Sequence, residues 1–543
     1  MRLLLASLLL CLVGSPCFAA TYELVIDRAP VTIGGQQRSV FTINGQSPGP
    51  TLRWTEGEEV TINVTNRLKE DTSIHWHGIL VPSNMDGVPG ISFDGIAPGT
   101  TFTYRFTVRQ SGTYWYHSHS GSQEQEGLDG SIVIAPRGGE PIKTDRDYVV
   151  VLGDSHPMPA ATIMRKLKQD ADYFNDRRRT LPDLMHDLSK AKTASERDAI
   201  LSDRLMWAEM RMDPADIADV TGYTFLVNGR APGDNWTALF KPGEKVRLRF
   251  IDASSMTLFD VRIPGLRMSV VQADGNAVRP VTVDAFRIGP GETYDVIVEL
   301  REDRAYTIQG ESIDRRGFAR ASLAPRAGMV GPAPEAGPPV LLTSRDMGMA
   351  MPGMASMPMD NMNMDPFPLA PPADVPAGAK VLNYADLHRL DHSYPLPPPG
   401  RTITLRLTGN MEKYIWSFDD KKYSERPALH FTEGETVRLV LRNETMMNHP
   451  IHLHGLWMDL ENGSSGGSNA DQPRKHTIIV PPGATVTVDV TMAAVGRWPF
   501  HCHLLFHMEA GMFREFVVHP RGEPLPTGPS MPADMTMSHA HHH

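Results

Sequence analysis

The sequence predicts an all-β protein of three related sandwich or barrel domains. Short segments such as Val60–Val64 and Phe102–Phe106 alternate apolar and polar residues with a period of two, which is typical of strands with one buried face. Turns centred on glycine or proline separate these segments. A similar turn precedes a strand at three places, and this recurrence indicates that one type of domain occurs three times. The three turns are Thr55-Glu56-Gly57-Glu58, Lys241-Pro242-Gly243-Glu244 and Thr432-Glu433-Gly434-Glu435.

The alternating pattern begins at Tyr22, returns at Gly222 and returns again at Thr402. Residues 159–217 are rich in Lys, Arg, Asp, Leu and Met without alternation, which predicts a helical insertion with a charged face. Residues 326–379 are rich in Pro, Gly and Met, which predicts a linker before the third domain. The predicted order is a first domain over 20–150, a second over 151–325 that carries the insertion, the linker, a third over 380–522, and a tail over 523–543 that contains Met and His.

The first residues have the pattern of a secretory signal peptide. Arg2 precedes the apolar run Leu3–Val13, and small residues follow at the positions that a signal peptidase inspects. We expect cleavage after Ala19, so that residues 1–19 are removed. The apolar run is much shorter than the roughly 20 residues that a bilayer span requires. The sequence therefore predicts an exported protein without a membrane span.

Composition narrows the class of protein. The 543 residues, 41% hydrophobic and 21% charged, can bury several cores, which excludes disorder throughout. The formal net charge of −10 argues against a nucleic-acid partner, because phosphate binding needs clustered Lys and Arg. Only Cys502 of the three cysteines lies beyond the predicted signal peptide, so it has no intramolecular disulfide partner. Metal ligation is our leading explanation for one thiol in an exported protein.

Four His-x-His pairs are the strongest chemical signal in the sequence. Residues two apart on a strand project to the same face, so each pair can direct two imidazoles toward one site. One such pair alone is more often a solvated surface pair, but four pairs among 21 histidines favour a shared metal cluster. Two pairs fall in the first predicted domain and two in the third: His75 and His77, His117 and His119, His452 and His454, and His501 and His503.

Alternation along the strand assigns Cys502 to a second site, because it lies between two histidines of one pair and must face the opposite way. His449 stands at odd spacing from the next pair and can face Cys502. His507 and Met512 follow at five-residue steps, and two His, one Cys and a weak axial Met are the ligands of a blue-copper electron-transfer site. A core methionine is the alternative for Met512. Zinc also accepts His and Cys, but the candidate ligands exceed one structural zinc site.

These motifs resemble, in order and spacing, the four copper motifs of the multicopper oxidases. The four are His75-Trp76-His77-Gly78, Trp115-Tyr116-His117-Ser118-His119, His449-Pro450-Ile451-His452-Leu453-His454-Gly455 and His501-Cys502-His503-Leu504-Leu505-Phe506-His507. Within the family the chain is similar to the bacterial copper-resistance protein A group, from Met85–Gly90, Tyr114–Gly121, Met446–Pro450 and a Met-rich tract. The resemblance covers nearly all of the mature chain and implies three cupredoxin-like Greek-key barrels and an oxidase that uses dioxygen.

The resemblance also implies four copper ions and a ligand set for each. It places type-1 copper at His449, Cys502, His507 and Met512. It places type-2 copper at His75 and His452, and the two type-3 coppers at His77, His117, His119, His454, His501 and His503. Cys502 would pass electrons onward through His501 and His503, which makes these three the catalytic residues together with a proton donor. We further expect His507 to be exposed to the reductant.

Two features depart from the family pattern. Members of the group usually carry a twin-arginine export signal, whereas this N-terminus has only Arg2, although export to the periplasm is still expected. Some multicopper oxidases place a carboxylate between the His-Cys-His triplet and the type-1 histidine, where Leu504–Phe506 is apolar here. Protons for dioxygen reduction must then come from elsewhere. Our candidate is Asp86, with Glu124 and Glu126 in reserve, and the alternative for Asp86 is an Asp-Gly turn.

Three hypotheses compete for the reductant. A cuprous oxidase is favoured because soft sulfur ligands select Cu(I) and the linker carries eight methionines. These are Met347, Met349, Met351, Met354, Met357, Met359, Met362 and Met364. A laccase-like phenol oxidase is the first alternative, with Trp207, Met210 and Met212 beside an aromatic pocket, although such residues more often pack in a core. Copper sequestration by the Met tract and the Met- and His-containing tail is the second.

A Cu(I)-accepting site beside the type-1 centre would need further donors in the third domain. We nominate Met446, Met447, Met458 and Asp459, which flank the copper motifs. Their alternative role is packing around the copper. Expected partners are Cu(I) or a phenol, dioxygen, and other periplasmic copper-handling proteins.

Overall fold

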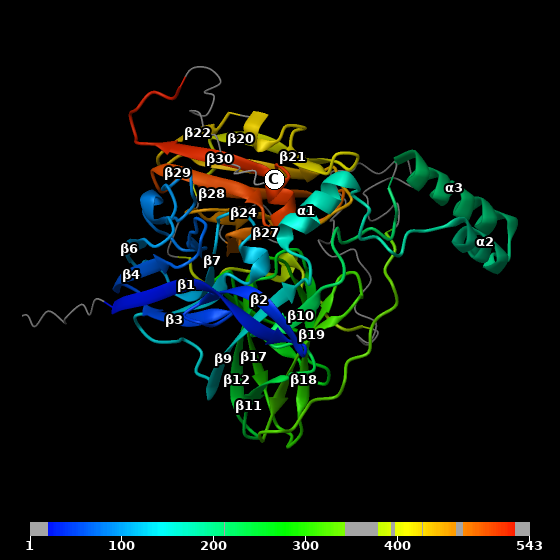
Figure 1. Cartoon of the computed structure of the whole chain (residues 1–543), viewed down its shortest axis with the longest axis horizontal. Helices are drawn as coiled ribbons and strands as arrows, with labels where there is room; N and C mark the ends of the chain where they lie inside the picture. Colours follow the sequence, from blue (N-terminus) through cyan, green and yellow to red (C-terminus); the bar gives the residue numbers. More distant parts are fainter. Residues whose placement is uncertain are drawn as a thin grey trace, which may run out of the picture.

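The computed structural model describes residues 20–210, 212–342, 378–392, 397–425, 427–462 and 471–526. It confirms the predicted all-β architecture, with three domains of two sheets each. Figure 1 shows the first domain in blue at the left, the second in green at the bottom and the third in yellow to red at the top. No helix in the described part of the chain is long and apolar enough to cross a membrane.

The first domain has two four-stranded sheets, ordered β2-β1-β4-β6 and β3-β8-β7-β5. The alternation in β4 buries Val60, Ile62 and Val64 completely, as its sequence predicts. The elements are β1 (Ala20–Ile33), β2 (Gln36–Ile43), β3 (Gly49–Thr55), β4 (Glu59–Asn66), β5 (His75–His77), η1 (Ser83–Met85), β6 (Thr101–Thr107), β7 (Gly112–His117), η2 (Glu124–Glu126) and β8 (Asp129–Ala135).

The second domain has a six-stranded sheet, β10-β9-β12-β17-β14-β15, and a five-stranded sheet, β11-β19-β18-β13-β16. Its strands are β9 (Arg146–Ser155), β10 (Thr224–Val227), β11 (Trp236–Leu239), β12 (Lys245–Asp252), β13 (Phe259–Arg262), β14 (Met268–Ala273), β15 (Asn276–Val283), β16 (Ala285–Ile288), β17 (Thr293–Glu299), β18 (Tyr306–Ser312) and β19 (Phe318–Ala324).

The third domain repeats this pattern with sheets ordered β21-β20-β23-β28-β25-β26 and β22-β30-β29-β24-β27. Its elements are η4 (Tyr384–Asp386), β20 (Arg401–Asn410), β21 (Ile415–Phe418), η5 (Tyr423–Glu425), β22 (Leu429–Thr432), β23 (Thr436–Asn443), β24 (His449–Leu453), β25 (Met458–Leu460), β26 (Arg474–Lys475), β27 (Thr477–Val480), β28 (Thr485–Thr491), β29 (Gly496–Cys502), α4 (Leu505–Glu509) and β30 (Phe513–His519).

The recurrent turn marks a recurrent topology. In every domain the strand that follows it, β4, β12 or β23, pairs in parallel with the domain's opening strand, β1, β9 or β20. A parallel pair cannot be joined by a tight hairpin, so the chain crosses to the other sheet in between. This mixture of parallel and antiparallel pairs makes each domain a Greek-key barrel with two sheets.

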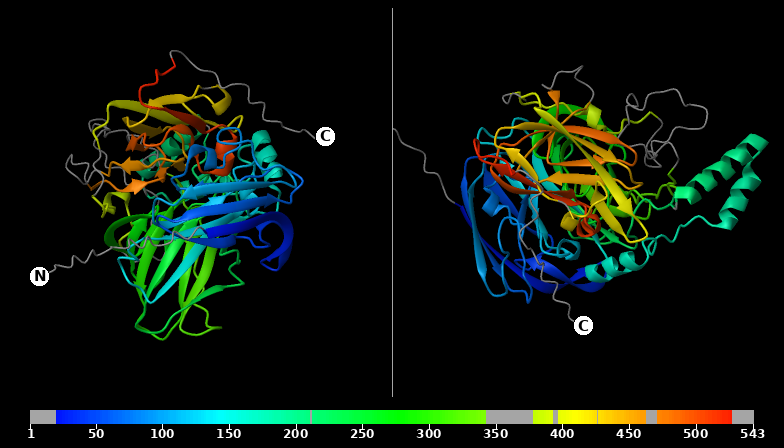
Figure 2. Two further views of the ribbon diagram at one scale, coloured as in Figure 1. Left: turned by 90° about the vertical axis from the view of Figure 1, so that its left-hand side faces the viewer. Right: turned by 90° about the horizontal axis from the view of Figure 1, so that it is seen from above.

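The helical insertion is confirmed as three helices, α1 (Ala160–Gln169), α2 (Leu181–Lys190) and α3 (Ala194–Met210). Helix α1 buries Ala160, Ile163 and Leu167, which share one face at helical spacing. It lies against the third domain, where the Lys168 ammonium donates a hydrogen bond to the Tyr414 carbonyl oxygen at 2.6 Å. Helices α2 and α3 form an antiparallel arm that projects from the body of the protein (Figures 1 and 2).

The first part of the segment predicted as a linker packs against the second domain. Residues 326–342 run along the second domain, where the Leu342 amide donates to the Pro214 carbonyl oxygen and the Gly337 amide donates to the Glu311 carboxylate. Leu342 is buried. Beyond the next described residue, 378, Tyr384 is buried between the second and third domains, with its hydroxyl 2.7 Å from a Glu292 carboxylate oxygen. The eight linker methionines, 347–364, lie outside the described residues.

Candidate metal centres

Eight histidines converge where the first and third domains meet. Register places His75 opposite His117 on β5 and β7, and His452 opposite His501 on β24 and β29. The second histidine of three pairs lies just beyond a strand end. Seven of the eight are at most 3% exposed, and His119 is half-buried. The eight are His75, His77, His117, His119, His452, His454, His501 and His503.

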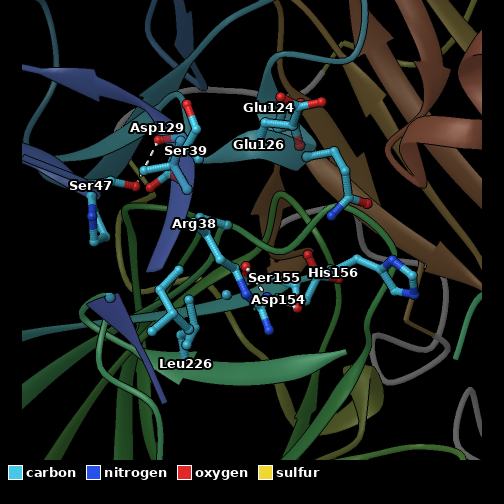
Figure 3. Close-up of a pocket in the computed structure, with 18 of the residues that line it drawn as sticks. Arg38, Ser39, Ser47, Glu124, Glu126, Asp129, Asp154, Ser155, His156 and Leu226 are labelled. Atoms are coloured by element: carbon cyan, nitrogen blue, oxygen red, sulfur yellow. Dashed lines mark hydrogen bonds between the residues drawn. The ribbon is translucent and has the colours of Figure 1, made fainter. Parts of the chain in front are cut away.

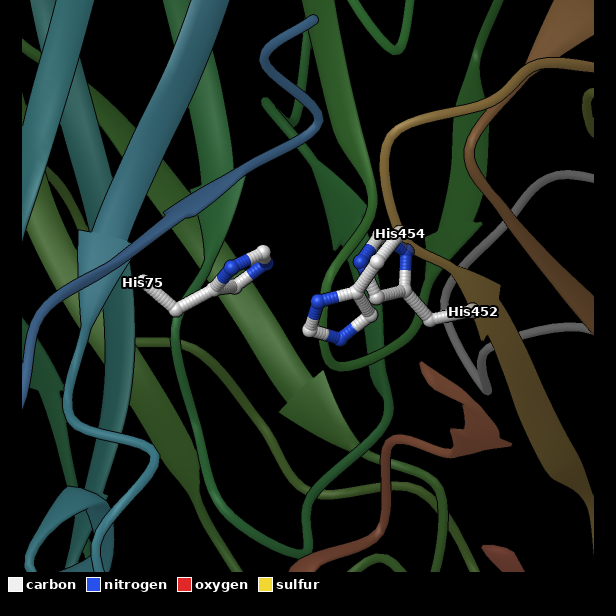
Figure 4. Close-up of side chains that lie close together, drawn as sticks. All are labelled: His75, His452 and His454. Atoms are coloured by element: carbon white, nitrogen blue, oxygen red, sulfur yellow. The ribbon is translucent and has the colours of Figure 1, made fainter. Parts of the chain in front are cut away.

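Rings from the two domains interleave, which brings together all four predicted pairs. His75 stacks on His454 with ring centroids 3.9 Å apart, and His77 stacks on His452 at 3.8 Å. Figure 4 shows His75 of the first domain facing His452 and His454 of the third. The Nε2 atoms of His119 and His501 lie 3.4 Å apart. A site of this kind exists only when the two domains are docked.

Hydrogen bonds set which nitrogen of each ring faces the cluster. Nδ1 of His75 donates to the Asp86 carbonyl oxygen at 2.8 Å, and Nδ1 of His452 donates to the His476 carbonyl oxygen at 2.8 Å. The Nε2 atoms of these two rings and of His117 are buried without a hydrogen-bond partner in the described structure. His77 is reversed, with Nε2 at 3.2 Å from the Thr477 hydroxyl and Nδ1 unpartnered. In each of these rings one nitrogen makes a hydrogen bond that orients the ring, and the other is buried and unpartnered. Copper prefers imidazole nitrogens of this kind as ligands.

The electrostatics of the cluster favours neutral imidazoles. Burial, reinforced by mutual repulsion among the rings, lowers the pKa of His77, His117, His452 and their neighbours well below the usual range. The same burial lowers the pKa of His501 to about 4. A neutral imidazole keeps the lone pair that a metal ion needs. The cluster is therefore ready to accept metal at neutral pH.

The metal-free protein is expected to lose stability as the pH falls below about 6.5, the ordinary pKa of histidine. Eight buried imidazoles and the half-buried His119 have lowered pKa values in the folded state, so the unfolded chain binds more protons and the free energy of unfolding falls with the pH. Each contributes up to about 1.4 kcal/mol per pH unit. The nine are His77, His117, His119, His449, His452, His454, His476, His501 and His503.

Buried carboxyls oppose this trend, because burial raises their pKa and the folded state favours their protonated form. The rise is largest at Glu124, Asp129, Asp216 and Asp252, and smaller rises occur at others, including Asp154, Glu292 and Asp295. We still expect net destabilisation in acid, because eight of the nine imidazoles lie in or beside one cluster, where each added positive charge repels the others. Thermal unfolding of copper-free protein from about pH 8 to pH 5 measures the effect, with copper-loaded protein as the control. A melting temperature that stays level or rises toward pH 5 would contradict it.

A second donor group lies within the third domain. The Cys502 thiol lies 3.5 Å from Nδ1 of His449 and 3.7 Å from Nδ1 of His507, and the two nitrogens are 3.1 Å apart. Met512 is fully buried, and its carbonyl oxygen accepts a hydrogen bond from the Cys502 amide. Burial raises the pKa of the Cys502 thiol, so its proton must leave when a metal binds.

The expectation that His507 is exposed is wrong. His507 is fully buried, and its Nε2 lies 2.7 Å from a carboxylate oxygen of Asp219, which the second domain supplies. Trp416 stacks on the ring with centroids 4.1 Å apart, and the Tyr414 hydroxyl donates to Asp219 at 2.6 Å. Asp219 of the second domain covers Nε2 of His507, and Trp416 and Tyr414 of the third domain pack beside the ring. A molecule in solution therefore cannot contact the His507 ring directly.

The three acidic residues proposed as proton donors lie at different positions relative to the histidine cluster. Asp86 is fully buried, with one carboxylate oxygen 2.9 Å from Nδ1 of His454 and the other 3.3 Å from Nδ1 of His75. Glu124 lies 2.8 Å from Nδ1 of His117. Glu126 instead forms an ion pair with Arg28 and contacts none of the eight histidines. Asp86 and Glu124 thus remain next to the cluster, whereas Glu126 faces away.

A cavity of about 380 Å³ lies between the first and second domains and reaches Glu124 (Figure 3). Asp129 and Asp154 also line it. Burial raises the pKa of all three carboxyls, that of Asp129 to about 8. Since Glu124 also contacts His117, its side chain lies between this cavity and the histidine cluster.

Other sequence candidates have packing roles. Met446, Met447 and Met458 are at most 3% exposed within the core, and Asp459 is paired with Arg474. The nomination of these four as an accessible Cu(I) site is therefore wrong. Trp207 is 2% exposed in the core of the second domain and Met212 packs against that core, so neither lines an open aromatic pocket. The Met210 side chain lies outside the described residues.

Sequence reasoning missed several residues that contact the candidate ligands. Asp219 and Trp416 contact His507, and the Thr445 hydroxyl lies 2.7 Å from Nε2 of His449. His476 is fully buried beside His77 and His452. These are single residues without a repeated spacing, and three of them, Asp219, Trp416 and His476, lie far along the chain from a histidine that they contact. No sequence pattern separates them from ordinary core residues.

Comparison with known families agrees with this geometry. Family models described as multicopper oxidase match residues 26–139, 147–323 and 396–522, one in each β-domain. The chain belongs to the multicopper oxidase family. It is therefore an oxidoreductase that uses dioxygen and binds copper as type-1, type-2 and type-3 centres, and the two donor groups fit these ions by residue type, burial and nitrogen orientation.

Relatives of this multicopper oxidase include bacterial proteins of similar length. It is 48% identical to the copper resistance protein A homolog of Pseudomonas syringae pv. tomato, over 91% of both chains. It is 46% identical to copper resistance protein A of Escherichia coli, over 91% of this chain and 92% of that one. Among solved structures, the laccase from Botrytis aclada shares the fold with a TM-score of 0.64 at 22% identity, covering 92% of this chain and 87% of that one.

Proposed function

We propose that this multicopper oxidase oxidises Cu(I) to Cu(II) with dioxygen and serves copper resistance. The observation that carries the proposal is the 48% identity, over 91% of both chains, to a protein named copper resistance protein A homolog. The Met-rich tract at 347–364 supports it, because thioether sulfur selects Cu(I). Four Cu(I) ions supply four electrons that, with four protons, reduce one dioxygen to two waters.

The proposed ligand assignment follows the family motifs and is supported by the direction of each nitrogen. His449, Cys502, His507 and Met512 would hold type-1 copper. His75 and His452 would hold type-2 copper through their unpartnered Nε2 atoms. The type-3 pair would take His77, His117, His119, His454, His501 and His503. When bound, these ions supply the one-electron oxidation of the reductant and the four-electron reduction of dioxygen.

The chain itself links the two donor groups. Cys502 is joined through the backbone to His501 and His503, so the thiol is a few covalent bonds from two cluster imidazoles. Nδ1 of His501 also donates a hydrogen bond to the Cys502 carbonyl oxygen at 2.9 Å. We propose that these three residues carry electrons between the centres.

We propose Asp86 as the group that holds a proton at the cluster, since its carboxylate reaches the outer nitrogens of His454 and His75. Glu124 is the second candidate, because it contacts His117 and lines the cavity between the first and second domains. The apolar stretch Leu504–Phe506 offers no carboxylate of its own.

We further propose that residues 1–19 are a signal peptide and that the protein acts in the periplasm with other copper-handling proteins. The proposed domain limits are 20–150, 151–325 and 380–522. The family-model matches over 26–139 and 396–522 each fall within one proposed domain, whereas the match over 147–323 and strand β9 begin a few residues before the proposed limit at 151.

A laccase-like oxidation of phenols is the second candidate. It is favoured by 27% identity, over 92% of this chain and 80% of the relative, to a protein named Laccase-1 from Cryptococcus neoformans. Copper sequestration without turnover is disfavoured, because storage needs no cluster of eight buried imidazoles. Oxygen uptake by copper-loaded protein, with a buffered Cu(I) complex and separately with dimethoxyphenol, discriminates these functions. Uptake with the phenol alone would favour a laccase, and uptake with neither would favour sequestration.

Replacing the eight methionines of the 347–364 tract by leucine is expected to raise the KM for Cu(I) on the order of tenfold, about 1.4 kcal/mol of binding. Leucine keeps the length and apolar character of the tract but removes every sulfur ligand. Dimethoxyphenol turnover should stay within about twofold, and it serves as the internal control. An unchanged KM for Cu(I) would rule out delivery by the tract.

A further inference from the structure

The Thr477 hydroxyl lies at the centre of three imidazoles behind the histidine cluster. Its Oγ1 is 3.2 Å from Nε2 of His77, 3.2 Å from Nδ1 of His452 and 3.1 Å from Nδ1 of His476. Thr477 and all three histidines are fully buried. His476 has no place in the proposed ligand set. The arrangement therefore joins two proposed copper ligands to a residue outside it.

One distribution of hydrogens gives each of the three contacts of the Thr477 hydroxyl a donor and leaves Nδ1 of His77 free for a metal. The His476 carbonyl oxygen, 2.8 Å from Nδ1 of His452, can only accept, so that nitrogen carries a hydrogen. A neutral His77 that offers Nδ1 as a lone pair carries its hydrogen on Nε2 and donates it to Thr477. The single hydroxyl hydrogen of Thr477 then goes to Nδ1 of His476. If His476 did not take it, the hydroxyl could donate to His77 and favour the wrong tautomer.

The middle domain fixes this arrangement. One carboxylate oxygen of Asp274 accepts hydrogen bonds from the backbone amides of His476 and Thr477, both at 3.1 Å. The other oxygen lies 3.0 Å from the Lys475 ammonium, which also pairs with Glu292 at 3.0 Å. Asp274 and Glu292 belong to the second domain, and all of these charged groups are fully buried. The carboxylate thus holds the backbone that carries both His476 and Thr477.

Two glycines leave the space that this group needs. A Cβ on Gly78 would lie 2.4 Å from Cδ2 of His476, and one on Gly291 would lie 3.0 Å from both Thr477 Oγ1 and His77 Cε1. Both glycines have positive φ, +77° and +93°. The first domain makes room for the His476 ring, and the second brings its backbone against the Thr477 hydroxyl. This close approach from two domains is independent of the hydrogen bonds.

We propose that Thr477 and His476, held by Asp274 of the second domain, are positioning residues that set the tautomer of His77 so that Nδ1 faces the copper cluster. The proposal rests on the proposed ligand role of His77. The second domain supplies no proposed copper ligand, but it would then help to orient the histidine cluster that holds the type-2 and type-3 coppers. Outer groups that orient a metal-ligating histidine typically affect metal affinity or activity by 10–100-fold.

The test removes the hydroxyl-to-imidazole hydrogen bond from either end. Thr477→Val and His476→Leu are each expected to lower the oxidation rate by about 10–100-fold and to weaken the near-ultraviolet absorption of the type-3 pair. The blue absorption of the type-1 centre should be unchanged. Thr477→Ser and His476→Asn keep a hydroxyl and an acceptor near the same atoms, so they should restore both signals. Thr491→Val is the matched control, because the Thr491 hydroxyl forms its hydrogen bond with the Thr436 hydroxyl, on β28 and away from the cluster.

Several outcomes decide whether Thr477 and His476 position His77. Full type-3 absorption and rate in Thr477→Val or His476→Leu would overturn the proposal, and either variant suffices if the other does not fold. A loss that the conservative variants fail to restore would also overturn it, because packing would then be the cause. His77→Gln separates this inference from the ligand assignment. If His77→Gln keeps the type-3 absorption, the assignment of His77 is wrong. If it loses that absorption while Thr477→Val does not, only the positioning role is wrong.

Discussion

Replacing Cys502 by serine is expected to abolish the blue absorption and reduce oxidase turnover to background, while the other copper centres remain. The thiol lies 3.5 Å from Nδ1 of His449 and 3.7 Å from Nδ1 of His507, and a hydroxyl is a poor substitute for a soft thiolate ligand. Alternation along β29 places Cys502 apart from the cluster formed by His501 and His503. The fold should survive with a loss of about 1–3 kcal/mol, the cost of burying a hydroxyl with poor partners.

Electron paramagnetic resonance and copper analysis of the Cys502→Ser variant measure this outcome. The type-2 signal should persist at the intensity of the parent protein, with about one copper fewer per chain. Met508→Leu is a suitable control, because Met508 neighbours His507 in α4 without belonging to either donor group. Loss of all copper from Cys502→Ser would show that the two sites are not independent.

Replacing Asp86 by asparagine is expected to lower turnover by about 10²–10⁴-fold, the usual contribution of a positioned proton donor. Its carboxylate contacts His454 and His75 from the outer side of the cluster. Asparagine keeps the shape and can accept one hydrogen bond, but it cannot deliver a proton. Reduction of the type-1 centre in the absence of oxygen should proceed at the parent rate, because Asp86 lies away from His507 and its neighbours.

Stopped-flow reduction without oxygen, followed by reoxidation with oxygen, separates these two steps. Only the second step should slow in Asp86→Asn. Glu126→Gln is the matched control, since Glu126 was an acidic candidate on sequence grounds but pairs with Arg28 away from the histidines. Equal slowing of both steps, or a parent-like reoxidation rate, would exclude Asp86 as the proton donor.

Local sequence patterns predicted most of the architecture. The alternation in Val60–Val64 fixed which side chains are buried in β4, and the recurrent Gly-centred turn marked the same position in all three domains. The loss of alternation at 159–217 predicted the helices α1 to α3. The linker was predicted less well, because residues 326–342 pack on the second domain through backbone hydrogen bonds that composition does not reveal.

Contacts between domains were beyond the reach of these patterns. The burial of His507 depends on Asp219, which lies almost three hundred residues earlier and in another domain. Trp and Tyr are ordinary residues of a core strand, so nothing in the sequence connected Trp416 and Tyr414 with His507. The sequence also could not show that Asp86 and Glu124 contact the histidine cluster while Glu126 does not. This difference depends on which residues of η2, and of the turn after η1, face the cluster.

The sequence by itself determined the residue types and their directions: four His-x-His pairs, with Cys502 facing away from its two neighbours. Those features depend on the two-residue period of a strand, which is a local property of the backbone. Only the tertiary structure decided which nitrogen of each ring faces the cluster, what covers His507, and that Asp274 of the second domain holds Thr477 beside His77. The orientation of His75 and His452 depends on loops that fold back within one domain. The contacts of Asp219 and Asp274 depend on docking between domains, which brings together segments hundreds of residues apart.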